Sequence, residues 1–358
     1  MRLARPSLKF ASSRIMPPRA AINIEEPAQL LPYLRGRRLI EDDEEPAFHA
    51  LAGGVSNRAV LVKRKGRESW VIKQALHKLR VEADWFSSPE RIHREAAGLR
   101  RLGKIISEHV PDLIYEDNEN HVLAMTAVPQ PHTNWKTLLL SGSIDIDYAR
   151  SFGSLLARIH NAIEHNSALA DEFAERRFFE ELRLEPYYGY SAKHVPQAAA
   201  FLHQLIDDTR ARRFALAHGD YSPKNVLIYR NNLIILDFEV IHFGDPAFDV
   251  GFSLTHFLSK AHHLPAHRES FLDLARRHWQ TYHDDLSAHL RERVRQYAAK
   301  HTLACMLARV AGRSPLEYLD AAERERQQQI VLALIEQDIA DVPALIDAFG
   351  AELRRIHE

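Results

Sequence analysis

The chain has 358 residues, of which 46% are hydrophobic and 27% charged, and its net charge is −1. This is enough chain for two lobes with a sizeable core, and the balanced charge gives no indication of a nucleic-acid partner. The single cysteine, Cys305, excludes an internal disulfide and a cysteine-based metal site, and it fits a reducing, cytoplasmic location. No stretch reaches the roughly 18 apolar residues of a membrane span, so no membrane partner is expected.

Residues 1–24 are predicted to form a disordered basic tail. The first twenty residues are basic and serine-rich, and no acidic residue precedes Glu25. The same composition suits a mitochondrial transit peptide, and Met16 offers an alternative start. Pro17-Pro18 argues against a helical presequence, so the tail is the favoured interpretation.

Residues 25–128 are predicted to form a small lobe. A weak helix is expected at Pro27–Leu34, followed by strand-like runs at Phe48–Leu51 and Ala59–Lys63. Between these runs lies Ala52-Gly53-Gly54-Val55-Ser56-Asn57. Glycine permits backbone conformations closed to other residues and lets amides approach phosphate oxygens, although a simple hairpin turn has the same composition.

Three further strands complete a five-stranded antiparallel sheet: Ser69–Lys73, Leu113–Glu116 and His121–Thr126. The first of them carries a lysine, Lys73, at its end. Lys63 also ends a strand and is its rival. The Trp-Val-Ile run before Lys73 makes the stronger buried strand, so Lys73 is preferred.

A helix is predicted from Ser88 to about Leu102. Ser88 is an N-cap candidate, and Pro89 after it suits the first helical turn. Glu95 lies four residues before Leu99 and borders the buried face, where it can pair with Lys73. On spacing alone, an exposed position for Glu95 is equally compatible.

The most informative stretch is residues 217–251, which begins with a loop and a hairpin. Two apolar, β-branched runs, Val226–Tyr229 and Leu233–Leu236, flank Arg230-Asn231-Asn232. Asn tolerates positive φ, so these residues predict a tight antiparallel hairpin.

Closing this hairpin brings Asn225, just before its first strand, close to Asp237, just after its second. A carboxylate and an amide oxygen at one place suit a hard cation such as Mg²⁺. Asp220 lies five residues before Asn225, on the loop that enters the same site. It is a candidate to accept a proton from an attacking hydroxyl.

The order His218-Gly-Asp220-x4-Asn225, then Asp237-Phe-Glu239, is that of the protein-kinase catalytic loop. With glycine after the histidine, and with Gly244-Asp-Pro-x-x-Asp249-Val-Gly251 following, it resembles the aminoglycoside phosphotransferase and choline kinase family. A plain β-turn with surface carboxylates is the alternative. Four ordered elements at matching spacing favour the kinase interpretation.

The resemblance implies ATP and Mg²⁺ as cofactors. Lys73, aligned by Glu95, would hold the α- and β-phosphates. The segment Gly53-Gly54-Val55-Ser56-Asn57 resembles the nucleotide loop of the family. Met125 and Ala127 lie in a segment that resembles the hinge, whose backbone groups would meet an adenine edge, although any strand-to-helix connection can have this form.

The same resemblance divides the catalytic roles. Asp220 is implied to be the base that orients the acceptor hydroxyl, and Asn225 with Asp237 to hold Mg²⁺ against the phosphates. Asp249 and His218 are expected to brace the catalytic loop rather than to touch substrate.

A narrower resemblance, to methylthioribose kinase, covers some 30 residues of the small lobe. It is carried by Val71-Ile-Lys-Gln-Ala-Leu76, Leu79-Arg-Val81, Trp85 and Ser88-Pro-Glu-Arg-Ile-x-x-Glu95-Ala96. The chain departs from that family in its Gly-Gly-x-Ser-Asn loop and in having Asn225.

Residues 129–358 are predicted to form a larger, mostly helical lobe with the catalytic loop and the acceptor site. Amphipathic spacing predicts a helix at Ser151–Glu164 and later helices at about 267–286, 291–311 and 320–340. Residues 166–212 are harder to interpret. Tyr187-Tyr188-Gly189-Tyr190 either lines a pocket or fills a loop beneath a helix, and the second is favoured.

The sequence therefore predicts an α+β, bilobal protein-kinase-like fold with a small antiparallel-sheet N-lobe and a helical C-lobe. The expected function is ATP-dependent transfer of the γ-phosphate to a hydroxyl of a small molecule: a sugar, amino alcohol, amino acid or aminoglycoside. Mixed Glu and Arg residues in 165–215 favour a neutral or anionic acceptor over a polycationic antibiotic. A regulatory pseudokinase and a metal-dependent phosphohydrolase are the alternatives. The oligomeric state and the choice between ATP and GTP stay open.

Overall fold

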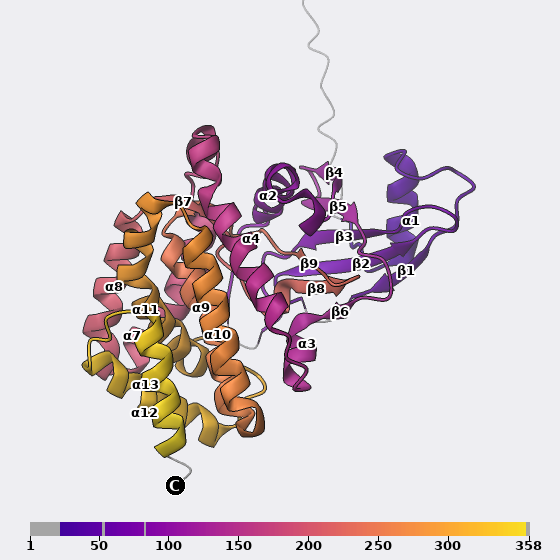
Figure 1. Ribbon diagram of the computed structural model, residues 1–358. Coiled ribbons are helices and arrows are strands. Elements are labelled where there is room, and N and C mark those ends of the chain that lie inside the picture. The colour runs from indigo at the N-terminus through magenta and orange to yellow at the C-terminus, as the bar shows by residue number, and fades with distance from the viewer. Residues whose placement is uncertain (1–21, 52–53, 82–83, 356–358) are drawn as a thin grey trace, which may run out of the picture.

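The chain forms two lobes in the computed structural model, which describes residues 22–51, 54–81 and 84–355 (Figure 1). The smaller lobe carries a five-stranded sheet, and most of the helices gather in the larger one. The predicted bilobal α+β architecture is confirmed.

The sheet of the small lobe is antiparallel throughout, with strand order β1-β2-β3-β5-β4. Its strands and the two helices that cover it are β1 (Ala47–Ala50), β2 (Asn57–Lys63), β3 (Trp70–Ala75), β4 (Leu113–Asp117), β5 (Val122–Thr126), α1 (Pro27–Gly36) and α2 (Arg91–Ile105). Helix α2 begins three residues after Ser88, whose hydroxyl accepts from the Glu90 N–H at 3.4 Å rather than capping the helix itself.

Alternation along the strands divides the core of this lobe between two faces. Ile72 packs with Leu30 and Leu34 of α1, while Leu123 belongs to the core that includes α2 and continues into the larger lobe. Because successive side chains of a strand point to opposite faces, Lys73 points away from α1, toward α2. The alternation of side chains along β3 therefore places Lys73 on the side of the sheet that faces the second lobe.

The large lobe begins with a short connection and a long helix: β6 (Thr133–Asn134), α3 (Trp135–Leu140) and α4 (Ile146–His165). Between α4 and the catalytic loop lie α5 (Ala168–Glu172), α6 (Arg177–Phe179), a π-helix (Glu180–Gly189), α7 (Tyr190–His194), α8 (Ala199–Ala211) and β7 (Ala215–Ala217). The hairpin and the C-terminal half consist of β8 (Val226–Tyr229), β9 (Asn232–Ile235), β10 (His242–Gly244), α9 (Pro246–His263), α10 (Arg268–Asp285), α11 (Ala288–Ala311), α12 (Ala321–Glu336) and α13 (Val342–Arg355).

Helix α9 is the central element of this lobe. It is buried over nearly its whole length and packs against α10 and α11, so it has no polar face from which an amphipathic pattern could be recognised. Asp245 caps its first turn by accepting from the Ala247 N–H at 3.1 Å.

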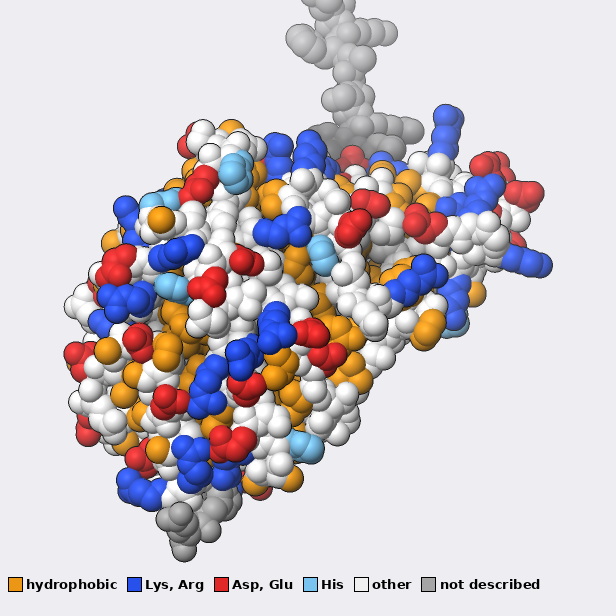
Figure 2. Space-filling model, viewed as in Figure 1, with side chains coloured by type: hydrophobic (Ala, Val, Ile, Leu, Met, Phe, Trp, Pro, Cys, Tyr) orange, Lys and Arg blue, Asp and Glu red, His pale blue; other side chains and the backbone are white. Residues whose placement is uncertain are grey.

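The distribution of charge on the surface and the polarity of the helices agree with the balanced composition of the chain. On the face shown in Figure 2, Lys and Arg side chains lie interspersed with Asp and Glu over both lobes. Among the residues described, no helix combines the length and the apolarity needed to cross a bilayer.

Candidate active site

A cavity of about 610 Å³ is lined by residues from both lobes. From the small lobe come the residues called here the sheet wall: Gly54, Val55, Ser56, Asn57, Lys73, Leu79, Val81 and Trp85. The catalytic loop and hairpin contribute the hairpin segment: Asp220, Ser222, Lys224, Asn225, Leu236, Asp237 and Glu239. The helical wall comprises Lys136, Leu182, Arg183, Tyr187, Phe252, His256, Arg309, Ser314, Pro315, Leu316 and Glu317.

The hairpin closes as its sequence predicts, with one difference in the turn. Tyr229 pairs with Asn232, so only Arg230 and Asn231 form the turn, with φ of 50° and 62°. Two left-handed residues in succession match the right-handed twist of the strands. The Leu236 N–H donates to the Asn225 carbonyl at 2.9 Å, which places Asn225 beside the residue that precedes Asp237.

Asp237 leaves the second strand in a left-handed conformation, with φ of 70°. This region is unusual for a residue other than glycine, and at such places strain often accompanies function. Burial acts to raise the pKa of the Asp237 carboxyl, but Lys73, Lys224 and Arg183 together hold it below its ordinary value. Asp237 is therefore an ionised carboxylate inside the cavity.

Lys73 bridges the two lobes by ionic contacts. Its Nζ lies 2.7 Å from Glu95 Oε1 on α2 and 3.2 Å from Asp237 Oδ1. Burial opposes the charge on Lys73, but Asp237 and Glu95 raise its pKa above the ordinary value. Glu95 is completely buried, so the exposed position that its spacing also allowed is excluded.

Asn225 and Asp220 contact each other directly. The Asn225 amide nitrogen donates to Asp220 Oδ2 at 2.7 Å and to the Asp220 carbonyl at 3.1 Å. Because the NH₂ group is used in these bonds, the amide oxygen of Asn225 is the atom left to bind a cation beside Asp237. Within the described residues no group of three or more His, Cys, Asp or Glu could hold a metal. Two oxygen ligands suit Mg²⁺, which usually completes its shell with phosphates and water.

Arg183, from the π-helix, is a residue that sequence reasoning did not assign to the site. Its Nη2 lies 2.7 Å from Asp220 Oδ2, and its Nε donates to the Gly219 carbonyl at 3.0 Å. With Arg183 and Asn225 both on Oδ2, Oδ1 of Asp220 is the oxygen left for an incoming hydroxyl. The sequence offers little indication of this role, because Arg183 lies in a stretch that Pro186 interrupts and that has no helical periodicity.

The catalytic loop is braced from below by Asp249. Its two carboxylate oxygens accept from the backbone N–H groups of His218 at 2.6 Å and Gly219 at 2.7 Å, and His160 Nε2 lies 3.1 Å away. Gly219 has φ of +79°, and a Cβ there would meet the Val240 carbonyl at 2.9 Å, so the loop requires glycine. These contacts match the bracing roles expected for Asp249 and His218.

Glu239 ties the hairpin segment to the small lobe. Its Oε2 accepts from Arg91 Nε at 3.0 Å and from the Asn57 amide nitrogen at 3.1 Å. Arg91 is fully buried and also donates to the carbonyls of Ser56 and Leu76. The carboxylate after Asp237-Phe therefore fixes the end of the Gly-Gly loop, a role that its position in the sequence did not reveal.

The other predicted site residues divide into two groups. Gly54, Ser56 and Asn57 line the cavity, although the Asn57 amide is held by Glu239, and Gly53 lies outside the described residues. Met125 and Ala127 do not line it within the described part of the chain.

The reason lies in the pairing of β5. Met125 is buried between its partners Val71 and Leu113, and the Ala127 N–H already donates to the Ser69 carbonyl at 2.9 Å. The hinge role of Met125 and Ala127 therefore stays a prediction.

The structure also decides two predictions that the sequence left open, the role of Tyr187-Tyr188 and the choice between Lys63 and Lys73. Tyr187 lines the cavity, so the preference for a purely space-filling role was wrong for this residue, whereas Tyr188 is buried in the core. The π-helix turns the two neighbouring rings in different directions. Lys63 is exposed at the end of β2, and the lysine brought to Glu95 is Lys73.

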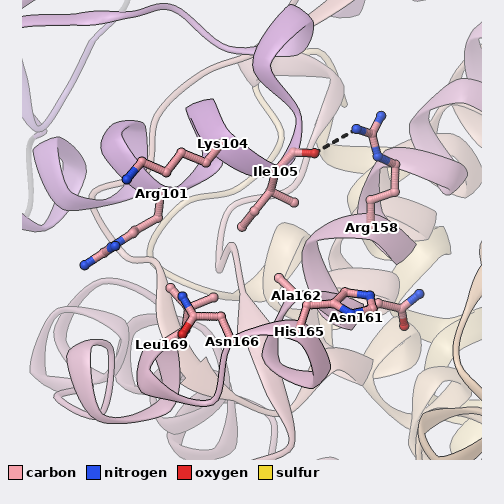
Figure 3. A pocket seen from close by; sticks show the side chains of 9 residues that line it. All are labelled: Arg101, Lys104, Ile105, Arg158, Asn161, Ala162, His165, Asn166 and Leu169. Atoms are coloured by element: carbon pink, nitrogen blue, oxygen red, sulfur yellow. Dashed lines mark hydrogen bonds between the residues drawn. The ribbon is translucent and has the colours of Figure 1, made fainter.

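A second hollow, of about 380 Å³, lies near the C-terminal ends of α2 and α4 (Figure 3). Its basic residues include Arg101, which pairs with Glu172 at 2.7 Å, and Arg158, which donates to the Ile105 carbonyl at 2.7 Å. Lys104 lies at its edge. Within the described part of the chain, none of the predicted site residues lines this hollow.

The sequence matches a known protein family and, at low identity, individual members of one group of kinases. The profile of the phosphotransferase enzyme family matches residues 47–284. Methylthioribose kinases from Pectobacterium atrosepticum and Erwinia tasmaniensis are each 24% identical, over 251 and 272 residues, or 59% and 64% of this chain. The chain spans 62% and 66% of the length of these two relatives.

Solved structures share the fold at low identity. An amicoumacin kinase in complex with AMP-PNP and Ca²⁺ matches with a TM-score of 0.57 at 13% identity, covering 84% of this chain and 92% of that one. A choline kinase from Cryptosporidium parvum matches with a TM-score of 0.55 at 12% identity, covering 90% of this chain and 100% of that one. These likenesses confirm the predicted protein-kinase-like fold.

Proposed function

We propose a function from one premise: the chain belongs to the phosphotransferase enzyme family. Its reaction is the transfer of the γ-phosphoryl group of ATP, with Mg²⁺, to a hydroxyl of a small molecule. The observation that carries the proposal is the meeting of Lys73, Asp237, Asn225 and Asp220 in one cavity between the lobes.

The sheet wall and Lys73 are assigned to the nucleotide. Lys73, held by Glu95, presents its ammonium group to the α- and β-phosphates, as in kinases that use a lysine on the third strand. Gly54 and Ser56 lie where backbone amides can approach phosphate oxygens. Asn225 Oδ1 and Asp237 would hold Mg²⁺, which when bound neutralises charge on the phosphates.

Asp220 is assigned to the acceptor. Its Oδ1 orients the acceptor hydroxyl and takes its proton as the oxygen attacks phosphorus. Arg183 and Asn225 hold the carboxylate in one orientation through Oδ2. Since phosphoryl transfer depends mostly on positioning and charge neutralisation, this fixed geometry is the main catalytic contribution of the chain.

The test is ADP formation from Mg-ATP, with and without a panel of small hydroxyl compounds. We expect ADP to form only when an acceptor is present. ADP formed equally fast without acceptor would instead indicate a phosphohydrolase. Nucleotide binding without any ADP would indicate a pseudokinase.

A lysine pair provides the matched variants. Lys73→Ala should lose most of the turnover because the phosphates lose their cation, whereas Lys63→Ala, at the exposed end of β2, should keep wild-type turnover. The opposite result would show that the phosphates bind at Lys63 on β2 and that their assignment to Lys73 on β3 is wrong.

A further inference from the structure

The helical wall carries an excess of positive charge beside the catalytic carboxylate. Its cations are Lys136, Arg183 and Arg309, with Lys224 of the hairpin segment beside them. The neighbouring carboxylates are Glu317 of the same wall and Asp220 of the hairpin segment. Arg183 is paired with Asp220, and Lys136 with Glu317. Among the described residues, Lys224 and Arg309 form no ion pair with a carboxylate, although they lie near enough to Asp237 and Glu317, respectively, to lower the pKa values of these groups.

Arg309 is the unusual member of this group because it is buried. Only 8% of its surface is exposed, yet it lines the cavity. Its Nη1 donates to the Ser314 carbonyl, to Ser314 Oγ at 2.9 Å and to the Tyr187 hydroxyl at 3.2 Å, while its Nε is buried with no hydrogen-bond partner in the described part of the chain. A buried guanidinium without a counter-ion is costly, and an anionic group of a ligand would remove that cost.

The position of Arg309 relative to Asp220 is defined through Tyr187. The guanidinium carbon of Arg183 lies 5.9 Å from the centre of the Tyr187 ring, and that of Arg309 lies 5.7 Å from the same centre. Arg183 in turn contacts Asp220. The two guanidinium carbons are therefore at most about 12 Å apart, and both arginines line the same cavity, so one extended small molecule can place a hydroxyl at Asp220 and an anionic group at Arg309.

The surrounding residues support a positive potential here. Burial, reinforced by Lys136 and Arg309 and opposed by Glu317, lowers the pKa of Lys260 to about 7. Burial, with Lys260, Arg309, Lys136 and Lys224, also lowers the pKa of His256, which lines the cavity. Burial is the main cause that drives both groups toward their neutral forms, and the cations around them add to it.

We propose that the acceptor carries an oxyanion, a carboxylate or a phosphate monoester, which binds Arg309 with Lys136 and Lys224 nearby. This inference rests on the proposed function and specifies its substrate class. The nucleotide phosphates do not supply the anion for Arg309, because they are assigned to the part of the cavity beside Lys73 and Asp237. Arg309 is held at the helical wall by its hydrogen bonds to Tyr187 and Ser314.

The experiment compares acceptors that differ only in the anionic group. Glycerate and glycerol phosphate are tested against glycerol, glucuronate and glucose 6-phosphate against glucose, with methylthioribose as a further neutral sugar. We expect kcat/KM about 10- to 100-fold higher for the acids, the effect of one charge-assisted hydrogen bond to a buried arginine. The carboxylate and phosphate members show which oxyanion is preferred.

The outcomes separate the inference from the function on which it rests. Equal or faster turnover of the neutral compounds, methylthioribose included, overturns the inference and leaves the kinase function standing. No acceptor-dependent ADP from any compound overturns the proposed function itself.

Variants of Arg309 supply a second test. Arg309→Met should lower kcat/KM for the acids more than for their neutral partners, so that the preference for acids is lost, and Arg309→Lys should restore part of that preference. Arg101→Met, in the basic hollow of Figure 3, makes the same charge change at an exposed site and should leave the preference intact. A loss of activity that is equal for acids and neutral compounds in Arg309→Met would assign Arg309 a purely structural role and overturn the inference.

Discussion

The two sides of the cavity are built in different ways. The sheet wall and the hairpin segment take their charged groups from one strand and from the loops at the ends of a two-stranded hairpin, whose spacing in the sequence is short and regular. The helical wall takes Lys136 from α3, Arg183 from the π-helix and Arg309 from α11, which are far apart in the sequence. One side is specified by local spacing, and the other only by tertiary packing.

This difference matches the roles proposed for the two sides, with the nucleotide at the sheet wall and hairpin segment and the acceptor at the helical wall. The triphosphate and its metal pose the same chemical problem in every kinase, so a lysine, an amide and a carboxylate at fixed places are sufficient. Acceptors differ, and the side that meets them is assembled from segments that can vary without disturbing the hairpin. Variants at the two sides should accordingly fail in different steps.

The largest effect is expected from the hairpin segment. Asp237→Ala removes the carboxylate proposed to bind Mg²⁺, which is also the partner of Lys73, so turnover should fall to background and Mg-nucleotide binding should weaken. Calorimetry with Mg-ATP beside an ADP assay measures both quantities. Asp171→Ala, on the surface of α5, is the matched control and should behave as wild type. Undiminished nucleotide binding in Asp237→Ala would contradict its role as a metal ligand.

Asp220→Asn should give the next largest effect, and on turnover alone. The amide keeps the size of the side chain but removes the base, and general-base assistance is worth about 10²- to 10⁴-fold. Nucleotide affinity should stay at the wild-type value because Asp220 is not assigned to the nucleotide. If Asp220→Asn binds Mg-ATP as poorly as Asp237→Ala, Asp220 is a metal ligand and the proposed division of roles is wrong.

Arg183 should show a smaller effect, confined to the acceptor step. Arg183→Met removes the charge-assisted contacts to Asp220 and Gly219, which should lower kcat by about 10- to 100-fold. Arg183→Lys keeps the charge without the planar fork and should recover part of this loss. Nucleotide affinity should change little in both variants. A fall in nucleotide affinity equal to the fall in kcat would place Arg183 on the triphosphate instead.

The same contrast explains how much could be predicted from sequence. Asn225, Asp237 and Asp220 were placed together because a hairpin of eight strand residues leaves little freedom in where its ends lie. Lys73 was preferred to Lys63 because it ends the more apolar strand, whereas spacing left Glu95 either buried or exposed and only the family resemblance favoured its pairing with Lys73. Arg183 and Tyr187 could not be placed, since a π-helix interrupted by proline has no 3.6-residue period. Helix α9 was also missed because it is buried on all sides and lacks a polar face.

The last effect concerns stability rather than turnover, and it tests the charge around the helical wall. Lys260 is completely buried in α9, donates to the His256 carbonyl at 3.0 Å, and has its pKa lowered from 10.5 to about 7 by burial, with Lys136 and Arg309 adding to the effect. Below about pH 7 the amine is protonated in both the folded and the unfolded chain, so folding bears the whole cost of the buried charge. Between pH 7 and 10.5 the folded chain releases the proton while the unfolded chain keeps it, so the free energy of unfolding rises with pH.

Lys260→Met removes the cost of this buried charge and should stabilise the fold at pH 7 by up to about 4 kcal/mol, with the gain shrinking toward pH 10. Urea unfolding at both pH values measures it, with the exposed Lys104→Met as control. A loss of stability that is the same at pH 7 and pH 10 would mean that Lys260 is held as a satisfied cation, and that the helical wall is less positive than its arginines and lysines indicate.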